Sequence, residues 1–173
     1  MREGEVPMDS KYIFREARAD EIQAVFDLIM RRVAWMDTVG IKQWNTTKYD
    51  ERYPLDYYEK RRQMHELFVL EDGETGKMLA VGALFHDDIR WPDPQNAFYL
   101  HHLASDTDAK GFGSIFLEKA EAYTASCGKQ YMRLDSAIGN KFLESFYTSR
   151  GYVEAGNCSD GLYHGILRQK KLF

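Results

Sequence analysis

Apolar side chains near the start of the chain recur every three or four positions, which places them on one face of a helix: Ile22, Val25, Phe26, Ile29, Met30 and Val33. We expect this helix to begin near Asp20 and to end before Gly40, because glycine commonly follows the last helical turn. A short strand at 12–15 precedes it. Pro54 suits the first position of a second helix, which we expect to end near Glu66.

The middle of the chain consists of short β-prone runs separated by turn residues. Residues 67–70 and 78–85 are apolar, and the polar segment 71–76 between them contains two glycines, which predicts a hairpin. The segment 86–96 contains two prolines and reads as a loop. Residues 97–104 are then expected to form the next strand.

The last third of the chain alternates helical and strand patterns. We expect helices at 114–126 and 140–149 and strands at 131–134, 151–154 and 162–167. The order is then β-α-α-β-β-β-α-β-α-β-β. Antiparallel hairpins followed by a β-α-β crossover predict a mixed α/β fold, in which helices cover both faces of a mixed sheet.

Length, composition and charge narrow the class of protein. The chain has 173 residues, which predicts one domain at 11–173 behind a flexible N-terminal arm at 1–10. A hydrophobic fraction of 44% and a charged fraction of 29% are typical of a folded globular protein. The net charge of −4 lacks the basic excess that nucleic-acid binding needs, and no apolar run is long enough to span a membrane.

The cysteines and the N-terminus indicate a cellular location. Cys127 and Cys158 are too few for a disulfide framework and form no CxxC pair, so we expect two free thiols. Residues 1–10 are charged and contain no apolar segment of the kind found in secretory signals. The sequence therefore predicts a cytoplasmic protein without membrane or nucleic-acid partners.

A glycine-bearing turn joins the strand at 97–104 to the helix that follows it. Amide groups at the start of a helix have no partner within the helix and carry partial positive charge. Gly111 and Gly113 would let a ligand approach this backbone, so the turn is a candidate phosphate or diphosphate site. The glycines could equally serve only a tight turn. Neither the GxxxxGK[ST] nor the GxGxxG phosphate-binding pattern is present.

A second signal lies on the helix at 140–149. Asn140 and Tyr147 are seven positions apart, and two helical turns take about 7.2 residues, so their side chains share a face. Alternatively, Tyr147 is simply a half-buried aromatic beside Phe146.

Together these features resemble the GCN5-related N-acetyltransferase (GNAT) superfamily over roughly residues 12–167. The family pattern [Q/R]-x-x-G-x-[G/A] matches both glycines of 108–113. The later pattern N-x6-Y-x3-G-[F/Y] matches Asn140, Tyr147, Gly151 and Tyr152, and the segment 40–44 is similar to an early loop of some small bacterial members.

The match has two departures. Asp108 replaces the usual Gln or Arg, which puts an acid near an anion site, although the repulsion is modest if its side chain faces water. The segment between Ala104 and Gly111 is also slightly shorter than in common members. These departures motivate an alternative function, a CoA-binding sensor or partner-binding module without turnover. A nucleotide-phosphate binder without acyl chemistry is a weaker alternative.

The resemblance implies a mostly antiparallel sheet of six to seven strands with a splay between the fourth and fifth, in which acetyl-CoA lies as co-substrate. It also implies transfer of the acetyl group to a primary amine of a small molecule or peptide, by direct attack on the thioester and without a metal. A homodimer is plausible in this family. The implied cofactor contacts are the amides of Lys110, Gly111, Phe112, Gly113 and Ser114 for the diphosphate, and Leu103, Ala104 and Asn140 for the pantetheine arm. Tyr147 would protonate the leaving thiolate.

The reaction also needs a group that takes a proton from the amine. An alkylamine with a pKa near 10.4 must lose a proton at a cost of about 4.6 kcal/mol at pH 7. His101 and His102 are neighbours on one predicted strand, so we expect them to point to opposite faces. A similar histidine occurs in some family members, and His101 is the better match for a catalytic base. Either histidine could instead only pack and form hydrogen bonds.

Two further groups concern the acceptor side. Three acids near Trp91, namely Asp87, Asp88 and Asp93, could attract a cationic amine, but such acids are more often a solvated loop, which is the interpretation we favour. Trp35 and Trp44 lie where the first helices of the family roof the acceptor site, and they either line that site or belong to the core.

Overall fold

The computed structural model describes residues 11–173, so the expected arm at 1–10 lies outside the described residues. The seven strands are β1 (Tyr12–Glu16), β2 (Leu67–Asp72), β3 (Met78–Phe85), β4 (Ala97–Ser105), β5 (Tyr131–Ala137), β6 (Val153–Asp160) and β7 (Tyr163–Lys171). The helices are α1 (Ile22–Thr38), α2 (Tyr49–Arg52), α3 (Leu55–Gln63), α4 (Phe112–Ser126) and α5 (Lys141–Thr148), with single 3-10 turns η1 (Ala19–Glu21) and η2 (Trp44–Thr46). None of these helices is long and apolar enough to cross a membrane.

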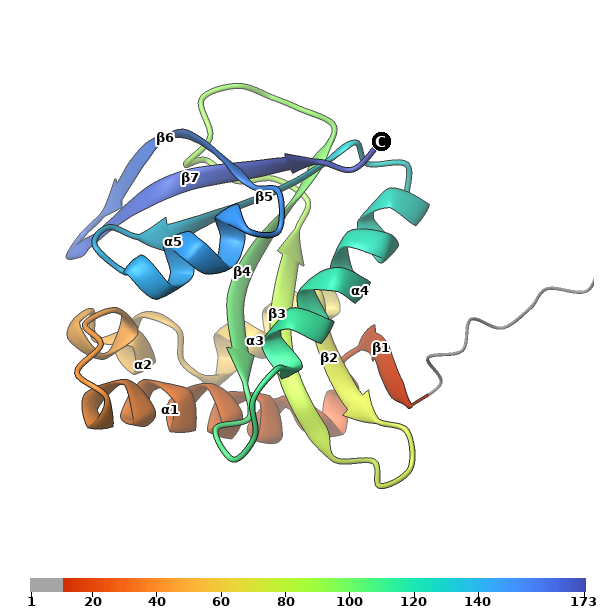
Figure 1. Cartoon of the computed structure of the whole chain (residues 1–173). Helices are drawn as coiled ribbons and strands as arrows, with labels where there is room; N and C mark the ends of the chain where they lie inside the picture. Colours follow the sequence, from red (N-terminus) through yellow and green to blue (C-terminus); the bar gives the residue numbers. More distant parts are fainter. Residues whose placement is uncertain (1–10) are drawn as a thin grey trace, which may run out of the picture.

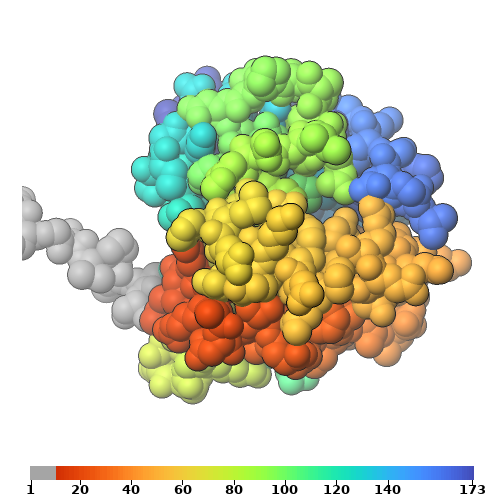
Figure 2. Space-filling model, turned by 180° about the vertical axis from the view of Figure 1, so that it is seen from behind, coloured from red at the N-terminus to blue at the C-terminus, as the bar shows by residue number. Residues whose placement is uncertain are grey.

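The strands form one mixed sheet in the order β1-β2-β3-β4-β5-β7-β6. Every neighbouring pair is antiparallel except β4 and β5, which are parallel and are joined by α4 (Figure 1). The predicted mixed sheet with a β-α-β crossover is therefore confirmed. Seen from behind, the red-to-orange atoms of the segment that contains α1 to α3 cover the lower part of the face (Figure 2).

Two apolar clusters hold the helices on the sheet. The predicted stripe of α1 faces the first cluster, in which Val25 and Ile29 are fully buried together with Val81 and Ala83 of β3. On the other face, α4 contributes Phe116 and its neighbours to a second cluster with β2, β4 and β5. Burying apolar side chains on both faces is what fixes the two helical layers relative to the strands.

The pair β4 and β5 separates along its length, as expected. Pairing runs only from Ala97 with Tyr131 to Leu100 with Leu134. Strand β4 continues to Ser105 along β3, whereas β5 continues along β7. Beyond Leu100, within the described residues, the side of β4 that faces β5 has no strand paired to it. This opening is the splay implied by the resemblance.

A β-bulge in β4 contradicts the expectation for the two histidines. Val81 pairs with Ala104 and Ala83 pairs with His101, so two residues of β4 oppose one residue of β3. His102 adopts a left-handed backbone conformation with φ of 57°. Because a one-residue shift turns later side chains to the other face, both histidines lie on the α1–α3 side, with ring centroids 6.0 Å apart. The prediction of opposite faces was therefore wrong.

Several element boundaries also differ from the sequence expectations. Pro54 is the N-cap of α3 rather than its first residue, and α3 ends at Gln63. Both C-terminal strands are longer than predicted. Strand β6 lies at the edge of the sheet and is mostly exposed, so it lacks the apolar alternation that would reveal its length.

Candidate active site

A cavity of about 1000 Å³ occupies the splay and extends under α1 and α2. Most of the site residues expected from the sequence line it: His101, Leu103, Lys110, Gly111, Gly113, Ser114, Asn140 and Tyr147. Trp35 and Trp44 line it as well. Ala104 and Phe112 are not among its lining residues; the ring of Phe112 packs edge-on against Tyr12 at 5.9 Å. The structure thus brings the two sequence signals, the glycine turn and the α5 pair, to one space.

The glycine turn presents free amide groups to this cavity. Gly111 is the N-cap of α4 with φ of 97°, a conformation that favours glycine. The first backbone bond of the helix runs from the Ile115 amide to the Gly111 carbonyl at 3.2 Å. The amides of residues 112–114 therefore have no partner within the helix. A Cβ atom placed on Gly111 would meet nothing within 4 Å, so a ligand has room to approach. The turn fits an anion.

The unusual acid in this turn, Asp108, lies outside the cavity wall. Asp108 is exposed and is not among the residues that line the cavity. Its amide donates to Asp106 Oδ1 at 3.0 Å, which tightens the turn. The carboxylate of Asp108 is therefore solvated, and its repulsion of a bound anion is modest.

Helix α5 positions Asn140 and Tyr147, the pair that the sequence places on one helix face. Asn140 is its N-cap: Oδ1 accepts from the Leu143 amide at 3.1 Å, and Nδ2 donates to Gln43 Oε1 at 3.3 Å. Two turns later Tyr147 is 6% exposed and packs edge-on against Phe146 and Tyr152. Burial raises the pKa of Tyr147, and Asp135 raises it further. The phenol is therefore protonated at neutral pH and can donate.

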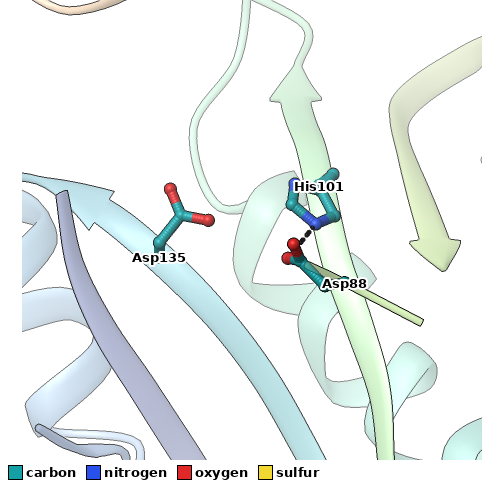
Figure 3. A group of neighbouring side chains, drawn as sticks. All are labelled: Asp88, His101 and Asp135. Atoms are coloured by element: carbon teal, nitrogen blue, oxygen red, sulfur yellow. Dashed lines mark hydrogen bonds and ion pairs between the residues drawn. The ribbon is translucent and has the colours of Figure 1, made fainter. Parts of the chain in front are cut away.

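His101 is held by a carboxylate that sequence reasoning assigned to a solvated loop. Its Nε2 lies 2.8 Å from Asp88 Oδ2 (Figure 3), and its ring stacks on Phe85. Burial acts to raise the pKa of Asp88, but the hydrogen bond from His101 and the charge of Arg90 bring it below its ordinary value. When Asp88 accepts from Nε2, Nδ1 is the ring nitrogen that is left to take a proton from a ligand.

The interpretation of the loop acids was thus wrong for Asp88, whose side chain is only 4% exposed. It holds for Asp87, which is exposed. Asp93 is about half exposed and accepts from Arg133 at 2.9 Å. Trp91 is buried beneath that arginine and does not line the cavity. No local pattern marks Asp88, because its role depends on the loop folding back onto β4.

Asp135 faces His101 and Asp88 across the splay from β5 (Figure 3). One ligand-type atom from each of the three lies within 4.8 Å of the others, a spacing that could hold a metal ion. However, His101 Nε2 is engaged by Asp88, and the Arg90 guanidinium lies 3.9 Å from Asp88 and interacts with Asp135. Because an arginine already supplies positive charge beside both carboxylates, the arrangement suits proton transfer better than metal binding.

His102 joins the β4 bulge to the layer formed by α2 and α3. Its Nδ1 is hydrogen-bonded to the Tyr49 hydroxyl, and its Nε2 lies 2.8 Å from the Tyr57 hydroxyl. Burial lowers the pKa of His102 well below its ordinary value, and His101, Arg61 and Arg90 add to this. The imidazole is therefore neutral and acts as a structural link between the strand and the helices that cover the cavity.

We expect His102 to make the fold sensitive to acid. An unfolded histidine takes up a proton near pH 6.5, whereas the folded protein resists protonation, so stability falls as the pH drops below about 6.5. The variant His102→Asn removes the titrating imidazole, and asparagine can adopt the left-handed backbone conformation at this position. Melting temperatures between pH 8 and pH 5 should fall less steeply for this variant than for wild type. His86→Asn, an exposed control, should keep the wild-type slope; equal slopes in all three proteins would refute the assignment.

Comparison with known proteins agrees with this geometry. No protein-family model matches the sequence, and neither does any curated protein. Many solved structures match. A GNAT-family acetyltransferase from Listeria monocytogenes is 21% identical with a TM-score of 0.73, over 92% of this chain and 94% of that chain.

Two further structures have similar coverage. PaiA N-acetyltransferase from Thermoplasma acidophilum, in complex with coenzyme A, is 18% identical with a TM-score of 0.70, over 92% of this chain and 98% of that chain. The ribosomal-protein-S18-alanine N-acetyltransferase from Escherichia coli is 17% identical with a TM-score of 0.67, over 93% and 94%. At these identities the similarity establishes the fold: the chain has the fold of the GNAT acetyltransferases.

Proposed function

We propose that this protein is an acetyl-CoA-dependent N-acetyltransferase that acts on a primary amine. The observation that carries the proposal is the shared cavity. One space holds the free amides of a helix start, the unpaired side of a strand, a protonated phenol, and a histidine held by a carboxylate. These are the groups that binding a CoA thioester and deprotonating an amine require.

The cofactor would lie along the splay. The amides of Lys110, Gly111, Phe112, Gly113 and Ser114 would hold the diphosphate, and the backbone of Leu103 and Ala104 would pair with the amide groups of pantetheine as an added strand does. Asn140 lines the same space and would bind that arm. This placement brings the thioester toward Tyr147 and His101.

The chemistry then follows from the two proton-transfer groups. His101 Nδ1 would accept a proton from the ammonium group of the acceptor, and the amine would attack the thioester carbonyl directly. The C–N bond forms, the C–S bond breaks, and Tyr147 would donate a proton to the leaving thiolate. The second proton lost by the amine nitrogen would restore the phenol of Tyr147, and the proton on His101 would pass to solvent. The net reaction converts an ammonium ion and acetyl-CoA into an acetamide, CoA and one proton. Small-molecule and peptide amines both remain candidate acceptors.

A direct test is release of free thiol from acetyl-CoA in the presence of a panel of amines. The panel should include monoamines, polyamines, amino acids and peptides with free N-termini, and products should be confirmed by mass. We expect at least one amine to release thiol in a protein-dependent way. CoA binding without thiol release for any amine would instead support the sensor function, and tighter binding of ATP than of CoA would support a nucleotide binder.

A further inference from the structure

Two arginines in the cavity wall have no carboxylate partner among the described residues. Arg32 donates from Nε and Nη2 to the Ser105 carbonyl, at 3.1 and 2.6 Å. Arg150 donates from Nε and Nη2 to Ser114 Oγ, at 3.2 and 2.6 Å. By contrast, six arginines of residues 11–173 form ion pairs at 3 Å or less: Arg15, Arg52, Arg61, Arg62, Arg90 and Arg133.

The geometry of Arg150 is that of an anion-binding group. Two donors of its guanidinium fork converge on one neutral hydroxyl oxygen, whereas such a fork matches the two oxygens of a carboxylate or phosphate. The guanidinium lies 3.8 Å from the centre of the Phe146 ring, and Nη1 donates to the Phe146 carbonyl at 2.9 Å. These contacts orient the side chain without neutralising it.

Arg32 likewise forms no ion pair with a carboxylate of residues 11–173. Burial lowers its pKa, and the charge of Asp106 acts in the opposite direction. The Asp106 carboxylate is occupied by Lys77, whose Nζ lies 2.7 Å from Oδ2. Helix α1 thus places a half-buried cation against the end of β4, where its partners are carbonyl and hydroxyl oxygens and the Trp35 ring, 4.5 Å away, and no carboxylate of residues 11–173 pairs with it. An anion in the cavity would supply the missing counter-charge.

The two cations flank the glycine turn. Arg32 binds Ser105 at the end of β4, and Arg150 binds Ser114 in the first turn of α4. Gly113 is close to both serines: a Cβ atom placed on it would be 3.7 Å from Ser105 Oγ, and Ser114 follows it in the chain. An anion on the free amides of the turn would therefore lie near both guanidinium groups.

We propose that Arg32 and Arg150 form a clamp for the diphosphate of CoA and supply the positive charge that Asp108 fails to provide. This inference rests on the proposed function and adds a residue from α1 and one from the turn that follows α5 to the cofactor site. Each phosphoryl group of a diphosphate carries one negative charge, so the charges of clamp and ligand match. On binding, the fork of Arg150 would exchange the Ser114 hydroxyl for phosphate oxygens.

The clamp can be tested by calorimetric titration with three probes: CoA, dephospho-CoA and pantetheine. Arg150→Gln should weaken binding of CoA and of dephospho-CoA equally, by about tenfold or more. Binding of pantetheine, which has no diphosphate, should change by less than about twofold. Arg150→Lys should recover part of the loss, and Arg32→Gln should act in the same direction. Arg31→Gln is the matched control, since it removes the same charge from an exposed position of α1.

The outcomes separate the clamp from the proposed function. If wild type binds CoA and transfers acetyl groups but Arg150→Gln binds CoA as tightly, the clamp is refuted and the function stands. A loss confined to CoA would assign Arg150 to the 3′-phosphate and overturn the diphosphate clamp. Equal losses for all three probes would show that Arg150 only supports the fold. If wild type binds no CoA, the proposed function itself fails.

Discussion

Tyr147→Phe is expected to lower the turnover of acetyl-CoA by about 10²- to 10⁴-fold while leaving the affinity for CoA nearly unchanged. The substitution removes only the hydroxyl group, and the ring keeps its edge-on contacts with Phe146 and Tyr152. Burial raises the pKa of Tyr147, so the phenol keeps its proton at neutral pH. In the variant the leaving thiolate would have no hydroxyl there to accept a hydrogen bond or a proton from.

The measurement compares kcat for thiol release with the dissociation constant for CoA, and Tyr152→Phe serves as a control. Tyr152 belongs to the same cluster, but its hydroxyl donates to Glu121 at 2.8 Å rather than lining the cavity. It should therefore keep most of the turnover. Parallel loss of turnover and CoA affinity in Tyr147→Phe would remove the role assigned to this phenol.

His101→Gln should have an effect of comparable size on kcat/KM at neutral pH, about 10²- to 10⁴-fold. Without the imidazole the acceptor must reach the site already deprotonated, so the loss should shrink as the pH rises toward the pKa of the amine. Asp88→Asn should also lower kcat/KM, because a neutral amide stabilises the imidazolium that forms on proton uptake less than a carboxylate does. The decisive readout is therefore the pH–rate profile.

His86→Gln provides the matched control for this experiment, since His86 is exposed and lies outside the cavity wall. Its pH–rate profile should coincide with that of wild type. A normal rate in His101→Gln at pH 7 would contradict the assignment of the base and would favour Asp135, a carboxylate that also lines the cavity.

The sequence predicted the parts of the site that depend on local pattern. Two of its signals each depend on a single turn or helix: the glycines at 111 and 113, and the seven-residue spacing of Asn140 and Tyr147. All four residues lie in the cavity wall. The apolar period of α1 was equally local and was confirmed by full burial of Val25 and Ile29. Such features need no knowledge of how distant segments meet.

The parts that the sequence did not reveal depend on tertiary contacts. Asp88, His101 and Asp135 come from a loop and two strands, and only the folded sheet brings them together. The bulge at His102 could not be predicted from the sequence, because a strand with one extra residue contains the same types of residue as a regular strand. The solvated interpretation of the loop acids was wrong for Asp88 for the same reason.

The short ladder between β4 and β5 has a consequence for how sequences with this architecture can diverge. One wall of the opening comes from residues 12–105 and the other mainly from residues 131–171, and only four residue pairs tie the two strands together. The turn at 109–114 is far in the sequence from α1 and α2, which contribute Trp35 and Tyr49 to the other end of the cavity wall. Substitutions in α1 and α2 can therefore change the shape of one end of the cavity without changing the backbone amides of the turn at the other end.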